Sequence, residues 1–174
     1  MLQKKFRENS VEIAYKIREC KGDKNKQKDL LRAELTASIG TEFDYTNLND
    51  GKGIPLSANL DILLMGVKIE KTSVFTSATR PLLLPFRWRS IKADREKDQE
   101  STLMMMFKTG DDMRQDALIL QLFSIMDTDL REVGLDMNFT IYNLISFTVD
   151  DGLLQFVPQS ATVTKIKKEL FPNN

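Results

Sequence analysis

Two amphipathic helices are predicted at the start of the chain. In the first, small or apolar residues recur every three or four positions with charges between them, as on one face of a helix: Phe6, Ser10, Ile13, Ile17 and Cys20. A second helix is expected through Leu30, Leu31 and Leu35. The basic segment 21–28 is interpreted as a solvated turn, with contact to anionic lipid or to a partner as the alternative. Residues 1–39 are therefore expected to form a helical segment.

The polar stretch that follows predicts a domain boundary. Residues 40–54 are rich in Gly, Asn and Asp, which favours a linker over a regular element. The Gly51-Lys52-Gly53 run lacks the spacing and the trailing Lys-Ser/Thr of a P-loop, so it is interpreted as a flexible turn.

After Pro55 the pattern changes to that of strands. Residues 60–69 are rich in branched apolar side chains with a partial alternation. Segments 74–75 and 82–88 flank a small polar turn and predict a hairpin. Two prolines place the second strand of this hairpin near an edge or a bend, Pro81 and Pro85.

The rest of the chain predicts one more strand, a long helix and a second hairpin. The charged segment 89–101 is expected to be an exposed loop, and the apolar run 103–108 suits a central strand. The helix is expected to begin near Asp111 or Asp112, whose carboxylates complement a helix N-terminus, and to end at about 133 before a glycine. Strands are then expected at 139–149 and 153–157, around the turn Asp150-Asp151-Gly152.

Composition excludes several function classes. Lys and Arg number 25, as do Asp and Glu, and this balance argues against a dedicated nucleic-acid binder. The chain has no histidine and one cysteine, Cys20, which excludes the usual imidazole zinc sites, histidine-based triads and an internal disulfide. With no long apolar run and no secretory signal, a cytoplasmic location is expected, at most peripheral to a membrane.

The segment 106–116 carries the most informative chemistry. A buried strand ends in Lys108, and a tight glycine turn leads to two acids and a helix. A lysine at a strand end is usually solvated, but it can also meet nucleotide phosphates. The run Met-Phe-Lys-Thr-Gly-Asp-Asp-Met-Arg-Gln-Asp resembles the FK-x-GDD-x-RQD signature of phosphoinositide 3-kinases, lipid kinases that phosphorylate an inositol ring.

This resemblance implies a fold and a set of roles. The order of elements matches a kinase small lobe, an α+β fold with an antiparallel sheet and one long helix, here expected over 55–174 after the end of an accessory helical domain. Lys108 is implied to pair with the α- and β-phosphates of ATP. Asp116, otherwise a solvated acid, is implied to meet Tyr142 at the back of the ATP pocket. Asp111 and Asp112 are interpreted as helix caps, and not as catalysts.

Two further segments resemble parts of the family's ATP site. The turn 75–81 resembles its phosphate-covering loop, with Ser77 as the candidate phosphate donor and with the flanking residues Phe75 and Pro81, although serine also favours turns for its own sake. The segment 154–157 resembles the hinge between lobes, and is equally suited to a core strand. Its implied adenine contacts are the Gln155 carbonyl, the Val157 amide and the neighbouring Phe156. Three side chains are expected to line the adenine slot: Leu84, Met106 and Leu154.

The similarity is greatest to class III enzymes, which make phosphatidylinositol 3-phosphate on endosomal membranes. Without histidine the family's DRH-type catalytic loop cannot be present, and the DFG and activation loops are also absent. No catalytic residue and no metal ligand is therefore assigned. The implied cofactors are ATP and Mg²⁺, with the metal held outside this chain, and regulatory protein subunits are implied as partners. The chain alone is expected to be inactive: a fragment, a truncated gene product or half of a split kinase.

The predicted function is the ATP-binding part of a phosphatidylinositol 3-kinase. The alternative is a catalytically dead lobe that binds a partner protein through its N-terminal helices. A protein-kinase lobe is disfavoured because no Gly-x-Gly-x-x-Gly loop precedes Lys108. The large lobe would cover the hydrophobic back of the sheet, so an exposed apolar patch is expected there.

Overall fold

A computed structural model describes residues 2–38, 53–92 and 101–170. An antiparallel sheet has the strand order β1-β2-β4-β5-β7-β6, with β3 paired beside β4. Its strands are β1 (Ile54–Leu56), β2 (Asn59–Val67), β3 (Ser73–Val74), β4 (Leu82–Ser90), β5 (Ser101–Thr109), β6 (Leu144–Ser146) and β7 (Asp151–Gln155). The helices are α1 (Leu2–Glu19), α2 (Lys24–Ala37), the 3-10 turn η1 (Ile69–Lys71), α3 (Arg114–Glu132) and α4 (Val163–Leu170). The prediction of an α+β fold with one long helix is confirmed.

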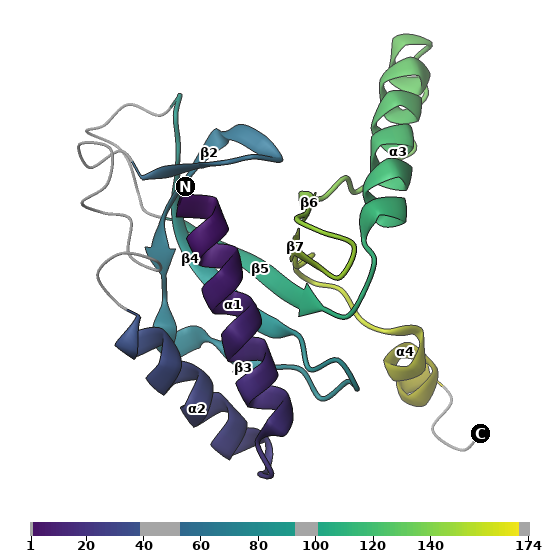
Figure 1. The fold of residues 1–174 in the computed structure, drawn as a ribbon. Coiled ribbons are helices and arrows are strands. Elements are labelled where there is room, and N and C mark those ends of the chain that lie inside the picture. The colour runs from purple at the N-terminus through teal and green to yellow at the C-terminus, as the bar shows by residue number, and fades with distance from the viewer. Residues whose placement is uncertain (1, 39–52, 93–100, 171–174) are drawn as a thin grey trace.

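Helix α1 lies across the face of the sheet, with α2 beside it (Figure 1). Its predicted stripe is buried except for Cys20, which follows the helix and is half-buried. Phe6 packs on Phe86 and Phe107, with ring centroids 5.9 and 6.2 Å away. The predicted turn 21–28 is shorter than expected. Because the Asp23 carboxylate accepts a hydrogen bond from the Lys26 amide (2.9 Å), α2 already begins at residue 24.

Side chains of the central strands alternate between the two faces of the sheet. Leu82, Leu84 and Phe86 of β4 face the α1 side, as do alternate residues of β5: Leu103, Met105 and Phe107. These residues form a single core with the apolar faces of α1 and α2. The period of two along each strand therefore determines which residues remain on the opposite face, which we call the open face.

The prolines do not place β4 at an edge. This strand is central, with β2 and β3 on one side and β5 on the other. Pro85 is tolerated because it lies where β4 passes from its pairing with β2 to its pairing with β3. On that side the Pro85 carbonyl accepts a hydrogen bond from the Lys68 amide (2.7 Å), and no amide of residue 85 is required.

The second hairpin is present, but its turn differs from the predicted one. The first strand is limited to β6, and the turn closes through the Phe147 amide, which donates to the Asp151 carbonyl (3.0 Å). Asp151 and Gly152 therefore belong to β7. A side chain at position 152 would begin 2.3 Å from the Met113 side chain and 2.5 Å from the Ile145 carbonyl. Gly152 therefore allows close packing within β7, whereas the Asp-Gly pattern predicted that it lies in a turn.

Several other boundaries also differ from the predictions. Strand β4 extends through Ser90, and α3 begins at Arg114, after both acids. Strand β1, η1 and α4 were not predicted. The predicted linker contains the start of β1 at Ile54, and its residues 40–52, like residues 93–100 of the charged loop, lie outside the described residues.

Helix α3 stands away from the sheet and carries the large exposed apolar surface (Figure 1). None of its residues is buried, and six large apolar side chains are 40% or more exposed: Leu118, Ile119, Leu122, Phe123, Ile125 and Met126. On the open face of the sheet Met104 and Met106 are half-buried. Among the described residues, the exposed apolar patch predicted for the sheet is therefore not found on its open face, and the six exposed side chains named here belong to α3 instead. In the described parts of the chain, no helix is both long and apolar enough to cross a bilayer.

A partly buried ion pair joins α1 to the second hairpin, with the Asp151 side chain 4% exposed and that of Arg7 31% exposed. Arg7 donates from Nε and Nη2 to the carboxylate of Asp151, at 2.8 to 3.0 Å, and Thr148 Oγ1 donates to the same carboxylate (2.7 Å). Burial of Asp151 by itself raises its pKa. The hydrogen bonds from Arg7 and Thr148, together with the charge of Arg7, outweigh burial and hold the pKa of Asp151 below its ordinary value.

We expect Arg7→Gln to lower the free energy of unfolding by about 2 kcal/mol at pH 7, because it leaves a buried carboxylate without its charged partner. Since the folded-state pKa of Asp151 is depressed, the contribution of this pair is present above a pH of about 4 and is lost as the pH falls through that pKa. Urea unfolding at pH 7 and at about pH 2 measures both effects.

The matched control is Arg131→Gln, which removes an arginine paired with Asp127 and Asp136 on the surface of α3. Exposed pairs contribute little, so we expect a change within about 0.5 kcal/mol. Equal losses in the two variants, or a loss for Arg7→Gln that persists undiminished in acid, would contradict the assigned role of Arg7.

Candidate functional site

Lys108 lies on the open face of the sheet, near the end of β5. Its neighbours Phe107 and Thr109 are buried on the α1 side, so the alternation of the strand directs Lys108 away from α1, together with Met104 and Met106. The Lys108 side chain is 26% exposed. Lys108 thus lies near the end of its strand, as predicted, and its ammonium group is at the edge of the half-buried apolar residues of the open face.

The two acids after Lys108 have separate partners. Asp111 pairs with the lysine itself, with 3.1 Å between its Oδ2 and Lys108 Nζ. Asp112 accepts hydrogen bonds from the side chain and the amide of Arg114, which lower the pKa of Asp112 to about 2. Only Asp112 therefore satisfies an amide at the start of α3. Asp111 serves as the counter-ion of Lys108, which corrects its interpretation as a helix cap.

Strand register shows which apolar residues share the open face with Lys108. Met106 is paired with Leu83 on one side and with Leu154 on the other, and residues directly opposite one another lie on the same face. Leu84 is paired with Met105 and is fully buried in the core beneath α1. The prediction that Leu84 lies on the same face as Met106 is therefore wrong, and Leu83 shares that face with Met106 instead.

The hairpin turn 75–81 has a fixed base and an exposed tip. The Phe75 amide donates to the Pro81 carbonyl, and the Arg80 amide donates to the Ser77 carbonyl, each at 3.0 Å. Pro81 is buried, whereas the tip residues 76–78 are exposed. Small side chains at an exposed tip leave its backbone open to a ligand, and this holds for Ser77, the predicted phosphate donor.

The predicted hinge segment closes the other side of the apolar surface. The ring of Phe156 lies against that of Phe75, with 6.0 Å between centroids, and the Phe156 amide donates to the Met104 carbonyl (2.7 Å). Gln155 is held by Asn143, whose carbonyl accepts from the Gln155 amide (2.7 Å). Phe75 and Phe156 thus bring the two predicted segments together. The roles of the Gln155 carbonyl and the Val157 amide remain predictions.

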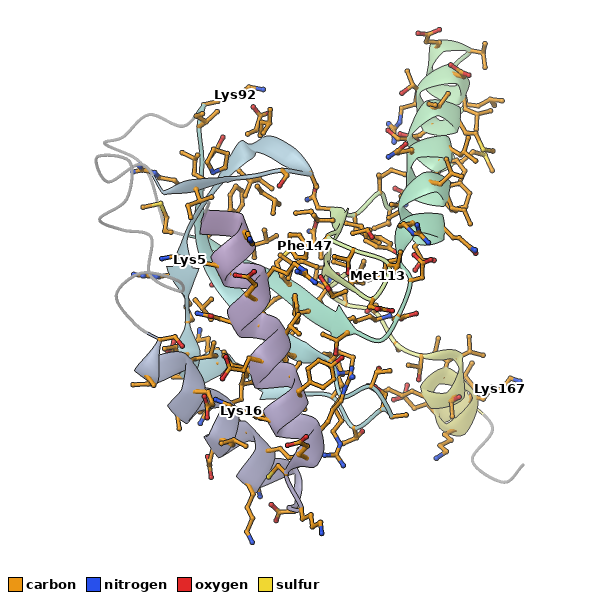
Figure 2. The ribbon with its side chains drawn as sticks, viewed as in Figure 1. Lys5, Lys16, Lys92, Met113, Phe147 and Lys167 are labelled. Carbon is orange, nitrogen blue, oxygen red and sulfur yellow. The ribbon has the colours of Figure 1, made fainter. Side chains whose placement is uncertain are left out.

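The predicted contact between Asp116 and Tyr142 is not formed. Both residues are described, and the hydrogen bonds of the described residues include none between these two. Asp116 is exposed on the first turn of α3, and Tyr142 is half-buried in the segment before β6. The reason is the position of α3, which leaves the sheet near Met113, labelled at the base of the helix in Figure 2, and packs mainly against β6.

Sequence reasoning missed two arginines beside this site. Arg18 of α1 donates to the Thr79 carbonyl at the base of the hairpin (3.0 Å), and Arg80 donates to carbonyls at the end of α1. The one local signal was the position of Arg80, between a small-residue turn and a proline. No periodicity reveals such contacts, because each partner lies 60 or more positions away.

Known proteins match most of this chain. Residues 102–173 match the family model described as phosphatidylinositol 3- and 4-kinase. The chain is 31% identical over 157 residues to the root isoform of phosphatidylinositol 3-kinase from Glycine max, covering 90% of the chain and 17% of that protein. The chain is also 31% identical over 157 residues to the Arabidopsis thaliana phosphatidylinositol 3-kinase VPS34, and this match covers 90% of the chain and 18% of that protein.

A human relative matches a shorter part. The C2 domain-containing subunit gamma of phosphatidylinositol 3-kinase from Homo sapiens is 37% identical over 113 residues, covering 65% of the chain and 7% of that protein. The chain thus spans less than a fifth of the length of each of these curated relatives. The resemblance noted in the segment 106–116 is confirmed, and the chain belongs to the phosphatidylinositol 3-kinase family.

Proposed function

We propose that this chain is the ATP-binding small lobe of a phosphatidylinositol 3-kinase, which in the whole enzyme phosphorylates phosphatidylinositol at the 3-position. The observation that carries this proposal is the position of Lys108. Its ammonium group lies on the open face of the sheet, next to a row of apolar side chains. The rings of Phe75 and Phe156 contact each other at the border of the same face.

The residues present fit a nucleotide. An adenine ring requires an apolar surface, which the row Leu83, Met106 and Leu154 supplies, and the phosphates require a cation, which Lys108 supplies. The exposed hairpin tip can bring the Ser77 hydroxyl and nearby amides toward the phosphates. These groups bind and orient the nucleotide, and none of them takes a proton from the lipid hydroxyl.

The lobe is proposed to be inactive alone. The chain has no histidine for the family's catalytic loop, and within the described ranges no three His, Cys, Asp or Glu side chains gather as a metal site. We therefore assign Mg²⁺, which neutralises phosphate charge in such transfers, to ligands elsewhere in the enzyme. The same proposal places the enzyme at the periphery of endosomal membranes, with regulatory protein subunits as partners.

The alternative function, protein binding through the N-terminal helices without catalysis, has less support. Five large apolar residues of those helices are fully or almost fully buried in the shared core: Phe6, Ile13, Ile17, Leu31 and Leu35. Among the side chains of α1 and α2 that the structure describes, the exposed ones are mainly charged, and Tyr15 is the large apolar one exposed. A partner would therefore find little apolar surface on α1 and α2.

We expect Lys108→Met in the full-length enzyme to reduce kcat/KM for ATP by about 10- to 150-fold, because a charge-assisted hydrogen bond to phosphate is worth roughly 1.5–3 kcal/mol. The measurement is the initial rate of phosphatidylinositol 3-phosphate formation at a series of ATP concentrations. Lys68→Met is the matched control, since Lys68 donates to the Thr102 hydroxyl (2.7 Å) and not to the site. An unchanged rate for Lys108→Met would exclude the proposed ATP site.

We expect Asp111→Asn to tighten ATP binding by about two- to fivefold, because it removes the carboxylate that competes with phosphate for Lys108. Asp112→Asn is the neighbouring control, since its carboxylate is engaged by Arg114, and we expect it to leave the dissociation constant unchanged. Calorimetric titration of the full-length enzyme with ATP gives both values. Weaker binding in Asp111→Asn would show that Asp111 orients Lys108 for the nucleotide instead of competing with it.

A further inference from the structure

The C-terminal end of α1 accepts hydrogen bonds from the candidate phosphate loop. Arg80 Nη1 lies 3.0 Å from the carbonyl oxygens of Ile17 and Arg18, and 3.4 Å from that of Cys20. The last carbonyls of a helix have no partner within the helix, and a cation is favourable there because of the helix dipole. Arg80 therefore caps the C-terminal end of α1, although it lies about 60 residues further along the chain.

Arg18 makes the reciprocal contact from α1. Its Nε donates to the Thr79 carbonyl (3.0 Å), and its Nη2 donates to the carbonyl and hydroxyl oxygens of Thr109. Thr109 directly follows Lys108, so one guanidinium joins the hairpin base to the strand end that carries the lysine. The Tyr15 ring lies 5.5 Å from Arg18 Cζ and restricts its orientation further.

The arrangement fixes the base of the hairpin and leaves its tip available. Thr79 and Arg80 are half-buried, whereas residues 76–78 are exposed. Arg80 has a φ of 43°, in the left-handed region that is unfavourable for a residue with a long side chain. The three carbonyl contacts of its side chain hold the backbone in this conformation and so determine the direction in which the tip extends.

We propose that Arg18 and Arg80 are positioning residues for the nucleotide. Through them the end of α1 sets the separation between the hairpin tip and Lys108, and hence the affinity for the phosphates of ATP. This inference rests on the proposed function and adds to it a role for the helical segment. Neither arginine touches the nucleotide, and each acts through the backbone of the hairpin or of β5.

The coupling must work in both directions. If the end of α1 improves phosphate binding by ordering the hairpin, bound ATP must in turn stabilise the contacts of Arg18 and Arg80 with their carbonyl partners. Amide hydrogens near residue 20 should then exchange more slowly when ATP is bound, although no atom of α1 belongs to the binding site. This readout does not depend on catalytic activity.

The test uses Arg18→Gln and Arg80→Asn in the full-length enzyme. Asparagine is chosen because it tolerates a left-handed backbone, so Arg80→Asn removes the side-chain contacts without adding strain. For each variant we expect KM for ATP to rise about three- to tenfold, with KM for phosphatidylinositol unchanged. Slower hydrogen exchange at residues 15–22 on addition of ATP and Mg²⁺ should be seen in the wild type and lost in both variants.

Two controls separate positioning from general stability. Lys16→Gln removes a neighbouring cation of α1 that pairs with Glu12 and with Glu34 of α2, and it should change neither readout. Figure 2 shows Lys16 on α1, on the side toward α2. Arg7→Gln destabilises the packing of α1 at its other end, so it should lower the Tm without a selective rise in KM for ATP.

The outcomes distinguish this inference from the proposed function. If Lys108→Met weakens the interaction with ATP as expected while Arg18→Gln and Arg80→Asn bind ATP as the wild type does, α1 has no positioning role and the inference is wrong. An equally large rise in KM in Arg7→Gln would show that Arg18 and Arg80 contribute only to stability, and this result would also overturn the inference. If ATP fails to bind even the wild type, the proposed function itself is wrong.

Discussion

The packing of α1 across β4 and β5 is the contact on which the rest of this structure depends. Phe6 at one end meets the rings of Phe86 and Phe107, and Ile17 near the other end is fully buried. Burying each such side chain contributes roughly 1.5–3 kcal/mol. By covering one face of the sheet, α1 determines which alternate residues of β5 remain on the open face, Lys108 among them.

The polar contacts of α1 then define its orientation on that apolar surface. Apolar packing is non-directional, whereas a guanidinium that binds two fixed oxygens has little freedom. Arg7 binds Asp151 near the N-terminal end, and Arg18 binds Thr79 and Thr109 near the C-terminal end. Arginines at both ends thus convert a hydrophobic contact into a defined alignment of helix, hairpin and strand.

The elements of this fold were predictable where a local pattern determines them. The stripe on α1, the apolar run before Lys108 and the pairing of the two hairpins all follow from short-range periodicity. The failures concern residues whose role depends on distant atoms. Leu83 and Leu84 are both leucines, so only the register with β5 shows which of them shares the open face with Met106. Asp151 was assigned to a turn because its partner, Arg7, is 144 positions away.

The candidate site was predictable only as a set of segments. The motif around Lys108 and the segments of Phe75 and Phe156 were found from sequence, and the structure brings them to one face of the sheet. The different partners of Asp111 and Asp112 were not evident, because the sequence does not show which of two adjacent acids pairs with the lysine and which with the arginine. No hydrogen bond of the described residues joins Asp116 and Tyr142, since α3 extends away from the sheet and packs mainly against β6.

The single core shared by α1, α2 and the sheet has a consequence for how such a protein is divided into modules. Sequence composition suggests a border near residue 50, between helices and strands, but the hydrophobic cluster crosses that border without interruption. The helices that composition separates from the strands supply part of the core that covers the sheet. Removal of α1 and α2 would therefore divide one hydrophobic core, and would expose Phe86 and Phe107 to water.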